Sequence, residues 1–166
     1  RLAIVSAMDE ELSALLPLLE GARVDVHAGR RFHVGKVGAH DAVLVLSGIG
    51  KVAAACTATM LIERYGVERL VFTGVAGGLH AQARVGDVVV ADTLLQHDLD
   101  ASPIFPRHEV PLLGLSRFAA DARLSAELHA AADSALKNAA WLGDDARALG
   151  VTEPRLHRGL VISGDR

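Results

Sequence analysis

Apolar and polar residues along this chain follow two kinds of pattern, short apolar runs and longer segments with helical spacing. The apolar runs predict strands at residues 2–7, 22–28, 31–37, 41–46, 70–72, 85–91 and 158–163. The helical spacing predicts a helix from residue 9 that Pro17 shortens or kinks, another from Lys51 to about Tyr65, and an amphipathic helix over residues 115–136. Strands and helices that alternate in this way are typical of the α/β class.

Residues 70–79 are the stretch around which the other elements are organised. Leu70, Val71 and Phe72 have no polar residue between them, which predicts a strand buried on both faces. Small residues follow directly in the segment Gly74-Val75-Ala76-Gly77-Gly78, and they leave the backbone bare. In open parallel sheets ligands bind at the carboxyl ends of the strands, so this turn is a candidate site. A tight turn without a ligand explains the stretch equally well.

Length and composition restrict the possible functions. A chain of 166 residues with 51% hydrophobic and 4% aromatic residues suits one domain with an aliphatic core. The formal charge of −3 gives no basic surface for nucleic acid, no apolar run is as long as a membrane span, and no secretory signal is recognisable. The single cysteine, Cys56, is expected in the core and suits a reducing cytoplasm. The chain starts with Arg1 and stops after a strand, so we expect a part of a longer protein.

Three acidic residues open the first predicted helix, and one of them is a candidate for catalysis. Ser6 and Asp9 have the spacing of a capping box, and Asp9, Glu10 and Glu11 suit the positive end of the helix dipole. Glu11 lies four residues before Leu15, beside the apolar stripe, so it should point toward the core at the ligand edge. Burial there would raise the pKa of its carboxyl, and Glu11 could then act as a general base.

Two patterns that could indicate a cofactor or a metal are weak. Gly48-x-Gly50-x-x-Ala53 follows a strand as in dinucleotide-binding folds, but no acid ends the next strand, and Glu68 precedes it instead. The close crossing of a helix and a strand needs the same small residues. We therefore predict no cofactor.

The segment from residue 97 to residue 111 is polar, rich in proline and longer than a plain connection, which predicts a binding or interface loop. His97, Asp98 and Asp100 lie in it, but three ligands this close together with no second cluster make a poor metal site. Hydrogen bonding at the surface is the better interpretation of these three residues, and we predict no metal.

Five segments, in this order and at these separations, resemble the methylthioadenosine/S-adenosylhomocysteine nucleosidases of the nucleoside phosphorylase superfamily. They are residues 6–11, 47–52, 73–79 with 85–87, 97–100 and 159–165. The resemblance implies a three-layer α/β/α sandwich around a central mixed sheet, and a homodimer. It also implies hydrolysis of the N-glycosidic bond of the purine thionucleosides 5'-methylthioadenosine and S-adenosylhomocysteine, with release of adenine.

The resemblance also assigns roles to single residues. It makes Glu11 the base that activates the attacking water, places Met8 against the ribose, and makes Ile49 part of the alkylthio pocket. The first turn suits water better than phosphate as the nucleophile, because three carboxylates would repel a phosphate dianion.

By the same resemblance, residues Val75, Ala76 and Gly77 would lie alongside the ribose and the base of the substrate. Many members of the family have Ser at the position of Val75. Phe105, in the long loop, would reach into the pocket of the neighbouring subunit. A glutamate that grips the ribose and an aspartate that protonates adenine are expected outside residues 1–166. The alternatives are a nucleosidase for another purine nucleoside, such as a futalosine-type compound, a nucleoside phosphorylase, and a non-catalytic nucleoside-binding or storage protein.

Overall fold

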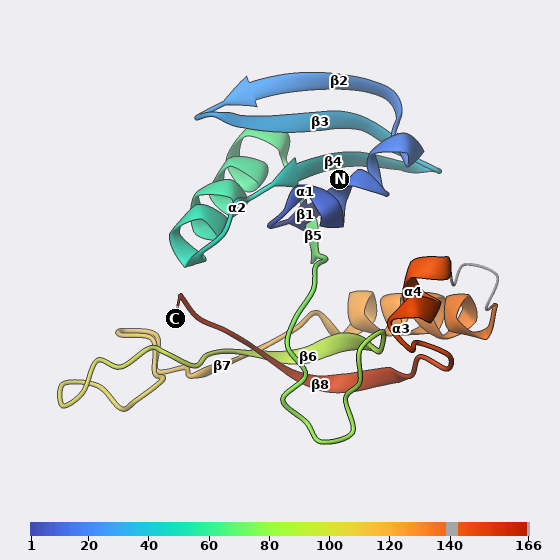
Figure 1. Cartoon of the computed structure of the whole chain (residues 1–166). Coiled ribbons are helices and arrows are strands. Elements are labelled where there is room, and N and C mark those ends of the chain that lie inside the picture. The colour runs from blue at the N-terminus through green and yellow to red at the C-terminus, as the bar shows by residue number, and fades with distance from the viewer. Residues whose placement is uncertain (139–142, 166) are drawn as a thin grey trace. The chain divides into compact units, whose positions relative to one another are not determined.

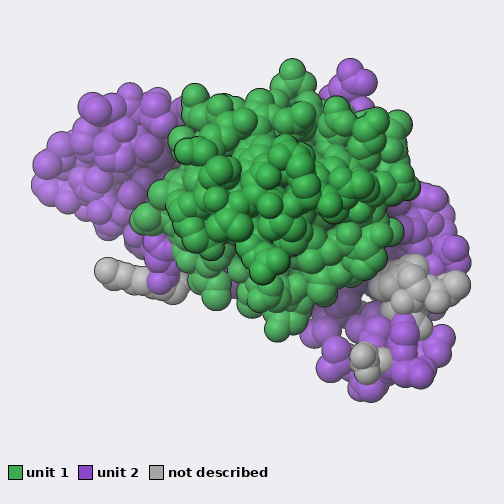
Figure 2. Space-filling model, turned by 90° about the horizontal axis from the view of Figure 1, so that it is seen from above, with its two compact units in different colours: residues 1–76 green, residues 77–166 purple. Residues whose placement is uncertain are grey.

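The computed structural model describes residues 1–138 and 143–165. They belong to two compact units, Arg1–Ala76 and Gly77–Arg166, which Figure 2 colours green and purple. Each unit has its own sheet. The single domain expected from the sequence stays a prediction.

The first unit is a mixed five-stranded sheet with helices. Along the chain its elements are β1 (Leu2–Ser6), α1 (Asp9–Ser13), a 3-10 turn η1 (Leu16–Leu18), β2 (Glu20–His27), β3 (Arg30–Val37), β4 (His40–Leu46), α2 (Lys51–Tyr65) and β5 (Arg69–Phe72) (Figure 1). The strand order is β2-β3-β4-β1-β5. β4, β1 and β5 run parallel, whereas β2, β3 and β4 form antiparallel pairs. The strand pair predicted around Gly29 and Arg30 is therefore confirmed.

The two faces of this sheet bury two separate apolar clusters, because side chains alternate between the faces of a strand. On one face α2 covers a cluster in which Phe32 stacks on Tyr65 with ring centroids 5.0 Å apart. On the other face Leu12 of α1 and Leu19, the residue that follows η1, pack with Leu44. Helices thus cover both faces of a mixed sheet, as the expected α/β/α layering requires.

The helix ends follow from local chemistry. Pro17 lies in η1, so α1 ends at Ser13 and the predicted shortening is confirmed. Gly66 ends α2 in the left-handed conformation with φ 59°, which costs glycine no steric strain. The predicted capping box with Ser6 is wrong, because Met8 occupies the N-cap of α1.

The second unit has a smaller mixed sheet. Its elements are β6 (Val88–Gln96), β7 (Arg117–Ala119), α3 (Ala122–Lys137), α4 (Asp144–Ala148) and β8 (Leu156–Ser163), with β6 between β7 and β8. β8 runs parallel to β6 and β7 runs antiparallel to it. The helix α3 packs against this sheet, and the Ser125 hydroxyl donates to the Ala91 carbonyl at 3.2 Å.

A buried carboxylate fixes the start of β6 against β8. Asp87 accepts from the backbone N–H of Arg155 at 2.8 Å and of Arg84 at 3.0 Å, and it pairs with His157 Nε2 at 2.8 Å. Burial by itself raises the pKa of Asp87, but these hydrogen bonds outweigh it and lower the pKa to about 2.

Three expectations from the sequence are wrong. β5 is the edge strand of its sheet, so Leu70 and Phe72 are exposed in their unit rather than buried on both faces. The helix predicted from residue 115 begins at Ala122, because the Asp121 side chain caps it and the residues before it form β7. Cys56 is exposed, because the buried residues of α2 are Thr57, Leu61 and Tyr65, and Cys56 does not belong to this buried stripe.

No helix within the described residues has both the length and the apolar character that crossing a membrane would need.

Candidate active site

The candidate site lies at the edge of the first sheet where β1, β4 and β5 end side by side. Backbone hydrogen bonds join the segments that leave these strands: Ser47 N–H donates to the Ser6 carbonyl at 2.8 Å, and Thr73 N–H donates to the Val5 carbonyl at 2.9 Å. The parallel pairing of the three strands therefore brings residues 6–8, 47–50 and 73–76 to one place. This is the edge at which parallel sheets bind ligands.

Glu11 joins two of these segments through both oxygens of its carboxylate. Oε2 accepts from the backbone N–H of Ala7 at 2.9 Å and of Met8 at 3.0 Å. Oε1 accepts from the backbone N–H of Val75 at 2.9 Å, across 64 positions of sequence. The expected contact between Glu11 and the turn after β5 is thus confirmed at Val75.

The electrostatic surroundings of Glu11 differ from those expected. Burial of the half-buried carboxyl raises its pKa, but the N–H groups of Val75, Met8 and Ala7 stabilise the charged form, and the net effect is a lowered pKa. The predicted raised pKa is wrong, because the backbone donors that oppose burial become visible only when the loops are in place. Glu11 is consequently ionised at neutral pH.

Gly74 is the residue that lets Glu11 reach the turn. A Cβ at this position would lie 2.7 Å from Oε1 of Glu11, a distance that real Cβ atoms do not show. The sequence indicated that small residues here leave room for a ligand. At Gly74 the carboxylate of Glu11 occupies the space that a side chain would fill.

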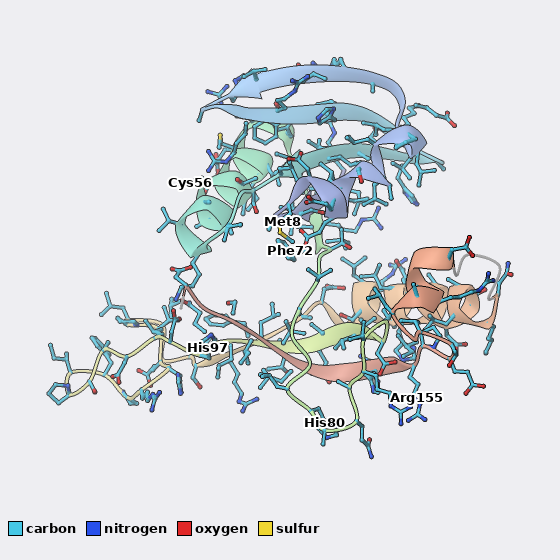
Figure 3. All side chains as sticks on the ribbon, in the orientation of Figure 1. Met8, Cys56, Phe72, His80, His97 and Arg155 are labelled. Atoms are coloured by element: carbon cyan, nitrogen blue, oxygen red, sulfur yellow. The ribbon has the colours of Figure 1, made fainter. Side chains whose placement is uncertain are left out.

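The structure distributes the other predicted site residues between the units. Met8, Ile49, Val75 and Ala76 all follow the carboxyl ends of strands in the first unit, with Ile49 and Val75 about four-fifths exposed at 80% and 78%. Figure 3 labels Met8, which follows β1, and Phe72, which ends the neighbouring strand β5.

Gly77 and Phe105 belong to the second unit. Gly77 is exposed, and Phe105 lies in the long loop, where its N–H donates to the Ala101 carbonyl at 3.1 Å. The substrate contacts of all six residues stay predictions.

A cavity of about 670 Å³ opens in the first unit between α1 and the hairpin of β2 and β3. Its lining consists of Asp9, Leu12, Ser13, Leu16, Ala28, Gly29, Arg30, Arg31, His33, Leu46, Ser47 and Gly48. Burial and the nearby charge of Arg31 lower the pKa of His33, so its imidazole is neutral at pH 7. The size is that of a small-molecule site.

The polar loop of the second unit makes its described contacts within that unit, both inside the loop and with residues 164 and 165 after β8. Asp100 accepts from the hydroxyl and the N–H of Ser102, at 2.6 and 3.0 Å, and these bonds lower its pKa. Asp98 accepts from the Asp165 N–H at 2.7 Å, and His97 lies against Gly164. In the part of the chain that the structure describes, no three His, Cys, Asp or Glu residues are grouped as metal ligands.

Sequence reasoning found Glu11 but missed what surrounds it. The backbone N–H groups of Ala7, Met8 and Val75 carry no signal in a sequence, because every residue but proline has one. The cavity was also missed. Its signal in the sequence is the pair Arg30 and Arg31, two neighbouring cations beside a tight turn.

Comparison with known proteins gives consistent results. Residues 1–166 match the family model of the phosphorylase superfamily. The 5'-methylthioadenosine/S-adenosylhomocysteine nucleosidase of Bacillus thuringiensis (strain Al Hakam) is 43% identical over 102 residues, which are 61% of this chain and 44% of that protein. The chain spans about half the length of the curated relatives it matches.

Solved structures are similar over nearly the whole chain. The nucleosidase of the same description from Neisseria meningitidis, in complex with methylthio-immucillin-A, has a TM-score of 0.85 and 29% identity, and the match covers 99% of this chain and 64% of that one. The nucleosidase from Colwellia psychrerythraea, in complex with adenine, has a TM-score of 0.82 and 32% identity over 99% of this chain and 62% of that one.

Proposed function

The chain belongs to the phosphorylase superfamily, and from this membership we propose that the protein is a nucleosidase that hydrolyses 5'-methylthioadenosine and S-adenosylhomocysteine. The nucleoside-phosphorylase-like α/β fold that the sequence predicted is confirmed. The observation that carries the proposal is the position of Glu11, whose carboxylate is fixed by three backbone N–H groups at the ligand edge.

The number of donors around Glu11 suggests what the carboxylate does. A carboxylate has about four lone-pair positions on its two oxygens. The N–H groups of Ala7 and Met8 occupy those of Oε2, and the N–H of Val75 occupies one on Oε1. One position on Oε1 is left for a further donor, and an attacking water would fill it.

The proposed reaction uses this water as the nucleophile. Its oxygen bonds to the anomeric carbon of the ribose while the bond from that carbon to the purine nitrogen breaks, and its proton passes to Oε1 of Glu11. Adenine leaves with a proton from an acid that the family resemblance places outside residues 1–166. The transition state has oxocarbenium character, as in other glycoside cleavage, and is strongly electrophilic.

The lowered pKa of Glu11 suits such a transition state. A carboxylate of low pKa is a weak base, but it is fully ionised at neutral pH and held in one orientation. An electrophilic carbon needs a well-placed water more than a strongly activated one. The negative charge also stabilises the positive charge that develops on the sugar.

The protein is further proposed to be a cytoplasmic homodimer that uses α2 and the loop of residues 97–111. In support, α2 carries exposed apolar side chains at Val52 and Ile62, Ile49 is exposed two residues before the helix begins, and the loop exposes Ile104. Exposed apolar side chains of this kind are often found at interfaces. The cytoplasmic location rests on a single cysteine in the 166 residues.

Phosphorolysis is the second candidate reaction, because Arg30 and Arg31 line a cavity beside α1 and could attract phosphate. Release of adenine from methylthioadenosine by the full-length protein, measured with and without inorganic phosphate, distinguishes the two. Hydrolysis predicts the same rate of adenine release with and without inorganic phosphate. A rate that depends on phosphate, or no adenine at all, would overturn the proposed function.

A further inference from the structure

One peptide group connects the end of β4 to the carboxylate of Glu11. The carbonyl of Ser6 and the N–H of Ala7 belong to the same peptide, and in a trans peptide these two groups point in opposite directions. The Ser6 carbonyl accepts from the backbone N–H of Ser47 at 2.8 Å, and the Ala7 N–H donates to Oε2 of Glu11 at 2.9 Å. A series of hydrogen bonds therefore runs from Ser47 through the end of β1 to Glu11.

The side chain of Ser47 adds a second donor to this series. Its hydroxyl oxygen lies 3.3 Å from the Ser6 carbonyl oxygen and 2.8 Å from that of Gly48, so the one hydroxyl proton is shared between the two carbonyls. Ser47 is 2% exposed and Ser6 is fully buried, so solvent does not compete for these groups. The hydroxyl thus fixes the turn after β4, in which Gly48 has a φ of 76°, against the end of β1.

Hydrogen bonds in series strengthen one another, because each bond that a peptide accepts polarises it. A carbonyl that accepts two bonds makes the N–H of its own peptide a stronger donor. Burial raises the pKa of Glu11, but the N–H groups of Val75, Met8 and Ala7 lower it further, and none of these causes is a charged side chain. The ionised state of Glu11 therefore depends on how well its backbone donors are held.

We propose that Ser47 is a positioning residue for the reaction, and that its hydroxyl holds the peptide between Ser6 and Ala7 in the orientation that binds the ionised carboxylate of Glu11. Ser47 acts through this peptide and needs no contact with the nucleoside. The inference rests on the proposed function and adds to it, because it gives the base of that reaction a support from a second strand.

Two substitutions separate the hydroxyl of Ser47 from the bulk of the side chain. Ser47→Thr keeps the hydroxyl, and Ser47→Val has a methyl group in its place, so the two β-branched variants differ in one group. Ser47→Ala, compared with wild type, repeats the test without added bulk in case the larger side chains do not fit the buried position.

The matched control is Thr57→Val. Thr57 is fully buried, and its hydroxyl donates to a backbone carbonyl, that of Ala53, at 2.9 Å. It lies in α2, outside the series of hydrogen bonds that ends at Glu11. Thr57→Val thus removes a buried hydroxyl of the same kind without touching the support of the base.

The first measurement is nuclear magnetic resonance of the full-length protein without substrate. Labelling alanine and valine with ¹⁵N shows the amide protons of Ala7 and Val75, which donate to opposite oxygens of the Glu11 carboxylate. In Ser47→Val the Ala7 amide proton should move upfield relative to Ser47→Thr, because its hydrogen bond weakens, and that of Val75 should move less. The pKa of Glu11, followed through a ¹³C label on its carboxyl, should rise for the same reason. Thr57→Val should change neither.

The second measurement is adenine release from methylthioadenosine by the full-length protein. Ser47→Val should lower kcat about threefold to tenfold relative to Ser47→Thr, because misplacing a catalytic group slows the reaction. KM should change by less than about twofold, since the hydroxyl is engaged with two carbonyls. Thr57→Val should keep the wild-type kcat, even where urea denaturation shows that it lowers the free energy of unfolding as much as Ser47→Val does.

The other outcomes overturn the inference. If Ser47→Val and Ser47→Thr have the same kcat and the same Ala7 resonance, the hydroxyl does not support Glu11. If KM rises and kcat is unchanged, Ser47 contacts the substrate instead. If Thr57→Val lowers kcat as much as Ser47→Val, the loss reflects stability alone. A wild type that releases no adenine refutes the proposed function separately, and the resonances of Ala7 and Glu11 still decide whether Ser47 holds the carboxylate.

Discussion

Replacing Glu11 by Gln tests the centre of the proposed mechanism. The amide has one acceptor oxygen, whereas the structure presents three N–H donors to the two carboxylate oxygens. If the amide oxygen of Gln keeps the hydrogen bonds from the N–H groups of Ala7 and Met8, the NH₂ group of the side chain faces the N–H of Val75. Two donors then face each other, and the hydrogen bond to Val75 is lost. The variant therefore loses one charge-assisted hydrogen bond and the group that receives the proton of water.

Two magnitudes follow from this geometry. A hydrogen bond to a charged group contributes about 1.5–3 kcal/mol, and Glu11 is only half-buried, so we expect the free energy of unfolding to fall by about 1–2 kcal/mol. Losing a general base costs a factor of about 10² to 10⁴ in rate. Typical domains have a free energy of unfolding of about 5–15 kcal/mol, so we expect the variant to stay folded at 25 °C and its loss of activity to report on chemistry.

The assay measures adenine release from methylthioadenosine by the full-length wild type, Glu11→Gln and Glu10→Gln. Glu10 is the neighbouring exposed carboxylate in the same helical turn and is the matched control. We expect Glu10→Gln to keep the wild-type rate and Glu11→Gln to lose it while still binding the nucleoside in calorimetry. Hydrolysis by Glu11→Gln at the wild-type rate would refute the reasoning and reduce Glu11 to a helix cap.

Three further predictions concern other parts of the chain. Gly74→Ala should lower kcat about tenfold or more, because the added Cβ would displace the Glu11 carboxylate. The control is Gly159→Ala, which should keep the wild-type kcat because the added Cβ meets open space. An unchanged kcat in Gly74→Ala would contradict the role of this glycine. Asp87→Asn should lower the free energy of unfolding by about 2 kcal/mol at pH 7, measured by urea denaturation. The folded pKa of Asp87 is depressed to about 2, so its contribution is present above the ordinary value and lost as the pH falls from about 4 toward 2. If the free energy of unfolding of Asp87→Asn stays lower than that of wild type by the same amount near pH 2, lost packing and not lost charge destabilises the variant. Sedimentation of the full-length protein should give a dimer at micromolar concentration, and a monomer would count against the proposed interface.

The sequence by itself determined the local elements and the identity of the candidate base. Apolar runs located β1, β4 and β8, Gly29 located the turn of the hairpin, Pro17 ended the first helix, and Gly66 ended α2. These features depend on residues close together in the chain, so a pattern can reveal them. Glu11 could be singled out for the same reason, since its spacing from Leu15 places it beside the apolar stripe.

Only the tertiary structure decided how this base behaves and what lies beside it. The pKa of Glu11 is lowered rather than raised because the N–H of Val75 reaches it from another strand, and Gly74 is required because the carboxylate fills its space. The cavity is lined by residues of α1 and of the hairpin of β2 and β3, which are distant in the sequence. Backbone donors have no sequence signature, and contacts between distant segments are fixed by strand pairing. A single sequence therefore predicts the residue that acts, and the fold decides its ionisation and its neighbours.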